Sequence, residues 1–165
     1  MLFALRALGV LLCALVVLIP IAATTGCAAT PEPESAFTEV GPLSYDFRVV
    51  WEATSEALQQ EGFPVELQER PTSDEGYMAS QVRTDGSDKM RSVELGRRAS
   101  ARVEKLDKKK FRLRLAASRF ERALPPPGVA PGDWHYVGRD EDLLARLRGR
   151  VDKNIERRYR PAEGG

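Results

Sequence analysis

The chain is poor in the residues that most often carry enzyme chemistry. Its 165 residues include one histidine, His135, and two cysteines, Cys13 and Cys27. A lone histidine without cysteines or clustered carboxylates is a poor metal site. No Gly-x-Ser-x-Gly, Walker or His-Glu-x-x-His motif occurs. These absences predict a non-catalytic protein with no metal and no cofactor, in which His135 has a surface or packing role. The alternative, an enzyme, requires a pocket in which carboxylates converge on His135.

Cysteine is scarce, and the position of Cys27 is informative. It follows an uncharged apolar run of 17 residues (7–23), which begins directly after the positively charged Arg6. Residues 22–27 read AATTGC, so small side chains lead into the cysteine. This three-part organisation is typical of an export signal. The alternative is an uncleaved transmembrane anchor, although the run contains Pro20 and is shorter than the ~20 residues of a typical span.

The same segment resembles the lipobox of bacterial lipoproteins, in which the signal peptide is cut before a cysteine that then carries lipid. The resemblance implies a signal peptide over residues 1–26 and a lipidated Cys27 as the membrane anchor. In Gram-negative bacteria, an Asp after the cysteine often retains a lipoprotein at the inner membrane. Because Ala28 occupies that position, we expect an outer-membrane protein that faces the periplasm. Nucleic acid is not an expected partner there.

Composition and periodicity divide the remaining chain into three parts. Residues 27–42 contain the lipidated cysteine and a polar, proline-broken stretch, which predicts a flexible linker. Residues 43–160 are expected to form a single domain, and residues 161–165 a short tail. A chain of this length can bury a usable core.

Two helices are predicted near the ends of this domain. In residues 45–61, one side of the helix is defined by Phe47, Val50, Trp51, Thr54, Ala57 and Leu58. Gly62 is well placed to end this helix. In residues 140–159, the corresponding stripe consists of Leu144, Leu147, Val151, Ile155 and Arg158. Acidic residues open the second helix and arginines close it, as the helix dipole favours.

Four strands are predicted between the two helices. Apolar residues alternate with polar ones in 63–67, 99–104 and 111–117, and the last two segments form a hairpin. Residues 76–84 are expected to form another strand, and residues 85–88 a loop. Residues 92–95 would extend the hairpin, with a bulge at Gly96 because Arg97 breaks the inward alternation. The predicted fold is α+β, with the order α-β-β-β-β-α and both helices on one face of an antiparallel sheet.

A second resemblance involves residues 50–53 (VWEA), 57–65 (ALQQEGFPV), 69–70 (ER) and 76–78 (GYM). They resemble the domains of the helix-grip lipoprotein of the β-barrel assembly machinery. In that family, an aromatic helix ends at Gly-Phe, a strand follows, and an acidic-basic turn leads to Gly-Tyr. The order of elements is also similar to that of the lipopolysaccharide-assembly lipoprotein. These resemblances imply an envelope protein partner and an accessory or scaffold role in outer-membrane or envelope assembly.

Charge is strongly segregated along the chain. Residues 28–80 hold two basic and eleven acidic side chains, a net charge of −9, whereas residues 81–165 hold 22 and 13, a net charge of +9. A basic hairpin patch predicts binding of an anionic envelope ligand, such as lipopolysaccharide, a phospholipid head group or a cell-wall polymer. Its members are Lys108, Lys109, Lys110, Arg112 and Arg114. Two alternatives are a solvated hairpin whose lysines discourage edge pairing and neutralisation of the basic half by the acidic first helix.

Trp134 and Tyr136 flank His135 next to a loop rich in proline and glycine. Aromatic residues concentrate at binding hot spots, so the two side chains are candidates for a partner contact. The alternative is that they pack over the end of the sheet.

Overall fold

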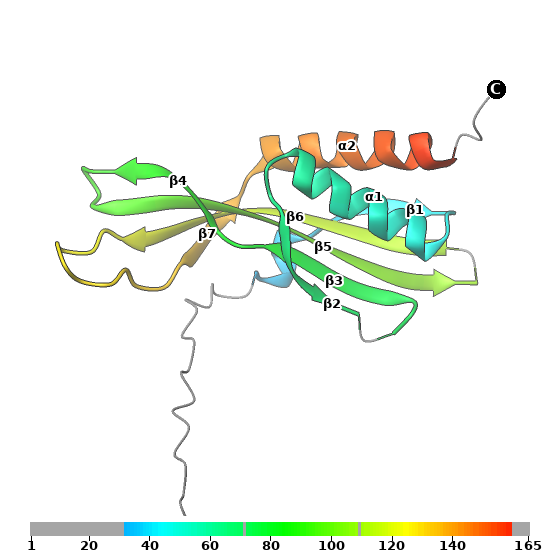
Figure 1. Cartoon of the computed structure of the whole chain (residues 1–165), viewed down its shortest axis with the longest axis horizontal. Coiled ribbons are helices and arrows are strands. Elements are labelled where there is room, and N and C mark those ends of the chain that lie inside the picture. Colours follow the sequence, from blue (N-terminus) through cyan, green and yellow to red (C-terminus); the bar gives the residue numbers. More distant parts are fainter. Residues whose placement is uncertain (1–31, 71, 109, 160–165) are drawn as a thin grey trace, which may run out of the picture.

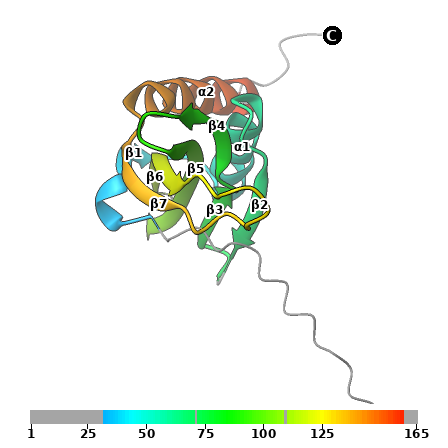
Figure 2. The same ribbon diagram turned by 90° about the vertical axis from the view of Figure 1, so that its left-hand side faces the viewer.

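The computed structural model describes residues 32–70, 72–108 and 110–159 (Figure 1). Cys27, Lys109 and the expected signal peptide and tail lie outside the described residues. The described chain forms a seven-stranded antiparallel sheet with two α-helices on one face (Figure 1, Figure 2). The elements are η1 (Glu34–Ala36, a 3-10 helix), β1 (Thr38–Leu43), α1 (Phe47–Gln60), β2 (Val65–Glu69), β3 (Glu75–Ser80), β4 (Arg83–Asp88), β5 (Val93–Asp107), β6 (Lys110–Ala123), β7 (His135–Arg139) and α2 (Glu141–Tyr159). The α+β prediction is confirmed, but the sheet has seven strands instead of about four.

The long hairpin of β5 and β6 is the centre of the sheet. Each of its two strands pairs on its outer side with two shorter strands, which lie one after the other along its length. Strands β3 and β4 pair with β5, while β1 and β7 pair with β6. We call the part of the hairpin that pairs with β1 and β3 (residues 99–107 and 110–117) the near half. It belongs to a sheet in the order β1-β6-β5-β3-β2. The remaining part (residues 93–98 and 118–123), which we call the far half, pairs with β4 and β7. It extends beyond the start of α2 (Figure 1).

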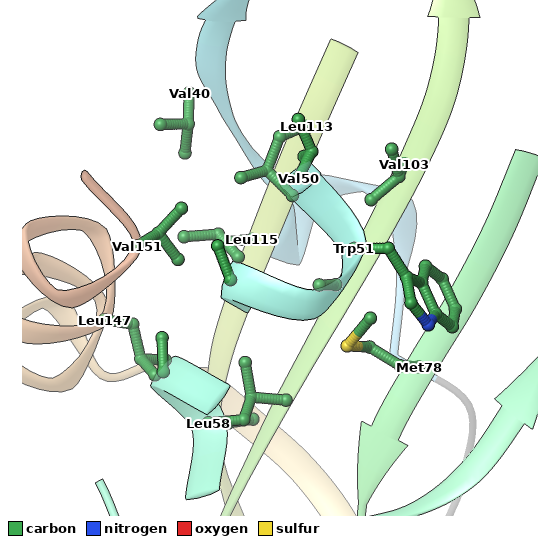
Figure 3. Packing of buried hydrophobic residues seen from close by; sticks show 14 of the residues in the cluster. Val40, Val50, Trp51, Leu58, Met78, Val103, Leu113, Leu115, Leu147 and Val151 are labelled. Carbon is green, nitrogen blue, oxygen red and sulfur yellow. The ribbon is translucent and has the colours of Figure 1, made fainter. Parts of the chain in front are cut away.

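The hydrophobic core lies between the helices and the near half of the sheet. The predicted inward residues of the hairpin are all buried: Ala99, Ala101, Val103, Phe111, Leu113, Leu115 and Ala117. The predicted stripe of α1 is buried as well, and Figure 3 shows Val50, Trp51 and Leu58 among the buried side chains of the cluster. In α2 the predicted stripe is wrong at Arg158, which is exposed. Asn154 is buried instead and donates a hydrogen bond to the carbonyl of Ala53 at 3.2 Å.

Two glycines determine how α1 is placed. Gly62 follows the helix with φ at +83°, a conformation that glycine adopts without a steric penalty. Gly76 lies under the ring of Trp51, so that a β-carbon at position 76 would lie 2.4 Å from Cζ3 of Trp51. Phe47 stacks on the same indole with ring centroids 5.6 Å apart. Trp51 therefore packs directly on the backbone of β3.

The three unpredicted strands lie at edges of the sheet and lack an apolar pattern. The segment 76–84 splits into β3 and β4, and residues 85–88, expected to form a loop, belong to β4. Almost every side chain of β4 is exposed, so its pairing with β5 depends on backbone hydrogen bonds. Strand β1 contains Gly41 and Pro42 and has a register shift there. Such irregular edge strands are common but carry little periodicity.

The predicted bulge at Gly96 is wrong. The register of β5 and β6 runs without interruption from the pair Val93–Ala123 to the pair Lys105–Phe111. A register shift occurs instead in β4, between Thr84 and Gly86. Arg97 keeps the inward alternation, but it lies in the part of β5 that pairs with β4, beyond the apolar core. A charged side chain is tolerated there because it remains partly exposed to solvent.

The flexible linker predicted for residues 27–42 is too long. Glu32 is buried, η1 begins at Glu34, and β1 extends the sheet from Thr38. The oxygen Oε2 of Glu32 accepts a hydrogen bond from the hydroxyl of Ser100, and Glu34 forms an ion pair with Arg102 at 2.5 Å. Residues 32–42 are thus held to the sheet by polar contacts and strand pairing. Their polar composition alone does not indicate these contacts.

Replacing Trp51 with Ala should lower the free energy of unfolding by about 3–5 kcal/mol, because it leaves a cavity between α1 and β3. Chemical denaturation of the two proteins measures this loss. The control is Val129→Ala, at a position 57% exposed in the proline-rich loop, which should change stability by less than about 0.5 kcal/mol. Equal effects of the two substitutions would contradict the assignment of Trp51 to the core.

Candidate functional site

Two of the four described cations of the predicted basic patch are paired within the fold. Arg112 lies 3.4 Å from a carboxylate oxygen of Glu39 and 3.9 Å from one of Glu104. Arg114 donates hydrogen bonds to Glu104 and to Glu34 of η1. These two arginines therefore already have anionic partners within the fold.

Two lysines of the patch remain exposed at the tip of the hairpin. Lys108 and Lys110 have no ion pair among the described residues, whereas Lys109 lies outside them. The described part of the patch is thus reduced from four cations to two. Exposed lysines at a hairpin tip are also what a solvated strand end requires. Of the described residues of the predicted patch, only Lys108 and Lys110 therefore remain available at the hairpin tip.

The alternative that the acidic first helix neutralises the basic half agrees with the contacts between the helices. Glu61, which follows α1, accepts hydrogen bonds from Arg146 at 3.0 Å and Arg150 at 2.9 Å. At the other end of the interface, Arg158 donates to Glu52 and Glu56, both at 2.9 Å. The opposite charges of the two halves of the chain therefore meet across the interface of α1 and α2.

The ion pairs shift the acid-base behaviour of the α1 carboxylates. Hydrogen bonds from Arg150 and then Arg146 lower the pKa of Glu61 below its ordinary value of 4.5. The side chain of Glu61 is only 10% exposed, so solvent screens these contacts less than it screens a fully exposed pair. A carboxylate whose pKa is lowered on folding stabilises the fold above its unfolded pKa, and that contribution disappears as the pH falls through the folded pKa.

Replacing Glu61 with Gln should lower the free energy of unfolding at pH 7 by roughly 1 kcal/mol, because two arginines lose one shared carboxylate. The difference from the unsubstituted chain should shrink as the pH falls below 4.5 and through the lowered pKa. Denaturation at a series of pH values measures it. Glu156→Gln, at an exposed position of α2 without an ion pair among the described residues, is the matched control. A pH-independent loss in Glu61→Gln would contradict the electrostatic explanation.

The face of the sheet opposite the helices carries a buried polar layer. Ser100 and Arg98 alternate with the core residues of β5, and both are buried. Arg98 donates a hydrogen bond to the phenol oxygen of Tyr77 at 3.1 Å, and burial raises the pKa of that phenol. Glu32 closes the layer over Ser100. The N-terminal segment is thus held to this face by hydrogen bonds as well as by packing of Ala36.

Trp134 packs over the end of the sheet, in agreement with the second of the two interpretations. Its side chain is 5% exposed, and the guanidinium of Arg122 lies 4.3 Å from its ring centroid. A β-carbon at Gly96 would lie 2.9 Å from the indole. Tyr136 is half-buried and lies edge-on to Phe120, with ring centroids 6.0 Å apart. Little of Trp134 is thus exposed for a partner, whereas Tyr136 is only half-buried.

His135 is exposed at the start of β7 and pairs across the strands with Glu121. The described residues contain no group of three or more His, Cys, Asp or Glu side chains that could hold a metal ion. The position of His135 agrees with the surface role expected for it.

An open groove of about 540 Å³ lies at the far half of the hairpin. It is formed by β4, β5, β6, β7 and the residue before α2, and its lining includes Asp85, Arg91, Arg97, Arg119, Glu121 and Asp140. We refer to it as the arginine groove. None of these residues was predicted as a site, yet one signal was present. Arg97 and Arg119 both place a charged side chain at an inward position of the hairpin, where an apolar one is expected, and they lie directly opposite each other.

A second groove of about 430 Å³ lies between β1 and α2. Val40 and Leu144 give it an apolar floor, and Arg139 at one end donates a hydrogen bond to the hydroxyl of Thr38 at 2.6 Å. Strand β1 is the last strand on this side of the near half, so its outer edge borders the groove.

No protein-family model matches this chain, and no curated protein matches it. Within the described residues, neither α1 nor α2 has the combination of length and apolar character that crossing a membrane requires.

Proposed function

We propose that the chain is a lipid-anchored accessory or scaffold protein of the bacterial cell envelope, without catalytic activity, which acts through a protein partner. The anchor would be Cys27, behind the apolar segment and the small residues that resemble a lipobox. Ala28 after the cysteine favours the outer membrane with the domain facing the periplasm. The resemblance to the helix-grip lipoprotein of the β-barrel assembly machinery supports a role in envelope assembly.

The observation on which this proposal depends most is the short distance between the anchor and the folded domain. Glu32, five residues after Cys27, already contacts the sheet through Ser100. Five residues span no more than about 18 Å even when fully extended. A lipid on Cys27 would therefore hold the sheet close to the bilayer surface.

The position of Glu32 also supports a particular orientation of the proposed lipoprotein at the membrane. Glu32 packs on Ser100, and the register of β5 places Ser100 on the face of the sheet opposite the helices. Figure 1 shows η1 on that side of the sheet and α2 on the other. A short tether from Glu32 would turn the polar face towards the membrane and the helices away from it. The groove between β1 and α2 would then be accessible to a partner.

Replacing Cys27 with Ser in the full chain, expressed in a Gram-negative bacterium, should abolish the acylation of the protein and release it from the membrane fraction. Labelling with a fatty-acid analogue and fractionation of the cells measure both effects. The matched control is Cys13→Ser, which removes the other thiol and should leave labelling and membrane retention unchanged. If the unsubstituted protein is itself unlabelled, remains membrane-bound and retains residues 1–26, an uncleaved transmembrane segment is the anchor.

The orientation can be tested with a fluorophore on single cysteines in the reconstituted lipoprotein. Ser35→Cys places the label on η1, and Lys153→Cys places it on the exposed side of α2; both positions are exposed. Quenchers attached to lipid head groups should reduce the fluorescence of the first label at least several-fold more than that of the second. Equal quenching at the two positions would contradict a fixed orientation.

A further inference from the structure

The arginine groove begins where the apolar core of the sheet ends. Ala99 pairs with Ala117 on the buried face, and the next pair on that face is Arg97 with Arg119. Side chains of such directly opposed residues have their β-carbons about 5 Å apart, and like charges in this arrangement are destabilising. The fold therefore retains a repulsive pair at a position where two apolar residues would continue the sheet pattern.

Only one member of this pair is compensated. Arg97 forms an ion pair with Asp85 at 2.6 Å and lies 3.6 Å from a carboxylate oxygen of Asp140. Arg119 is exposed and forms no hydrogen bond or ion pair with any residue of the described ranges. Gly138 lies opposite Arg119 on β7, so no side chain from that position covers the guanidinium.

None of the acidic residues of the groove pairs with Arg119; each has other partners. Glu121 accepts two hydrogen bonds from Arg91, at 2.8 and 2.6 Å. Asp88 accepts hydrogen bonds from backbone N–H groups of the turn between β4 and β5. Asp140 also accepts a hydrogen bond from the N–H of Leu143 at 3.0 Å, which caps α2. The groove thus contains three arginines and four carboxylates, but Arg119 is the side chain that lacks a counter-charge among the described residues.

We propose that the arginine groove binds a small ligand with an oxyanion group, a phosphate or a carboxylate, through Arg119. A planar guanidinium matches two oxygens of such a group with two parallel hydrogen bonds. The ligand would offset the repulsion between Arg119 and Arg97. Leu95 and the half-exposed Val137 provide apolar contact for the rest of the ligand. The volume of about 540 Å³ is in the range of small-molecule sites.

The test uses NMR of the isotope-labelled mature lipoprotein in micelles of an uncharged detergent, with inorganic phosphate as the probe. Saturable shifts are expected at residues 95–97 and 119–121. Arg119→Gln should weaken phosphate binding at least about tenfold, because it removes a charge-assisted hydrogen-bond pair. The matched control is Arg148→Gln, another exposed arginine without an ion pair among the described residues, outside this groove. Its phosphate affinity should equal that of the unsubstituted protein.

Thermal unfolding supplies a second readout that does not depend on spectral assignment. Phosphate should raise the Tm of the unsubstituted protein and of Arg148→Gln, but not that of Arg119→Gln. Equal affinity in Arg119→Gln, or equal losses in both variants, would overturn the proposal in favour of unspecific attraction to surface charge. Neither result bears on the anchor at Cys27, because binding is measured within the folded domain.

A third arm distinguishes a free ligand from a lipid head group. The same protein is placed in lipid nanodiscs that contain either phosphatidylcholine alone or added phosphatidylglycerol, without free phosphate. Shifts at the groove that require phosphatidylglycerol and Arg119 would identify a head group as the source of the oxyanion. Shifts that appear only when phosphate is added would identify a soluble ligand, as expected if the helix side faces away from the bilayer.

Discussion

The backbone ladder between β5 and β6 is the constraint on which the rest of the domain depends. Each strand of this hairpin is long enough to pair with two shorter strands in succession. Along the near half, the inward side chains are apolar and receive α1 and α2. Along the far half they become charged and border an open groove. One uninterrupted register thus gives both a hydrophobic core and a polar site.

Charge pairing explains how a chain with such segregated charge folds into one unit. The acids of α1 meet the arginines of α2, and the acids at the N-terminal end of the described chain meet the arginines of β5 and β6. Individual surface pairs stabilise a protein only slightly. Their value here is register and orientation, because each pair joins segments that are distant in the sequence. Because most arginines are paired within the described residues, an arginine without an acidic partner there, such as Arg119, is a candidate for binding an anionic ligand.

Periodicity predicted both helices, the central hairpin and β2, and missed three irregular edge strands; β2 itself is largely exposed, and Leu67 on it is 42% exposed. Both helices and the central hairpin follow from apolar residues at regular spacing, and their burial agrees with the pattern. Strands β1, β4 and β7 are held by backbone pairing at edges, which leaves no apolar alternation in the sequence. Arg97 breaks the apolar pattern of the sequence, which predicts a bulge that the structure does not contain. Arg119 occupies the inward position after Ala117, but only the cross-strand register places it directly opposite Arg97. The acidic Glu32 was assigned to a linker because its contacts lie 68 residues further along the chain.

The two tryptophans of the chain each rest on a glycine of a neighbouring strand. Trp51 covers Gly76 on the helix side, and Trp134 lies against Gly96 on the other side. In both cases a β-carbon on the glycine would overlap the indole ring. The order in which substitutions occur at such paired positions therefore matters. A smaller residue must replace Trp51 before a side chain fits at position 76, so evolutionary drift at these two sites is coupled and directional. At position 96 a β-carbon would also lie 2.6 Å from Cγ1 of Val82, so a side chain there requires changes at both Trp134 and Val82.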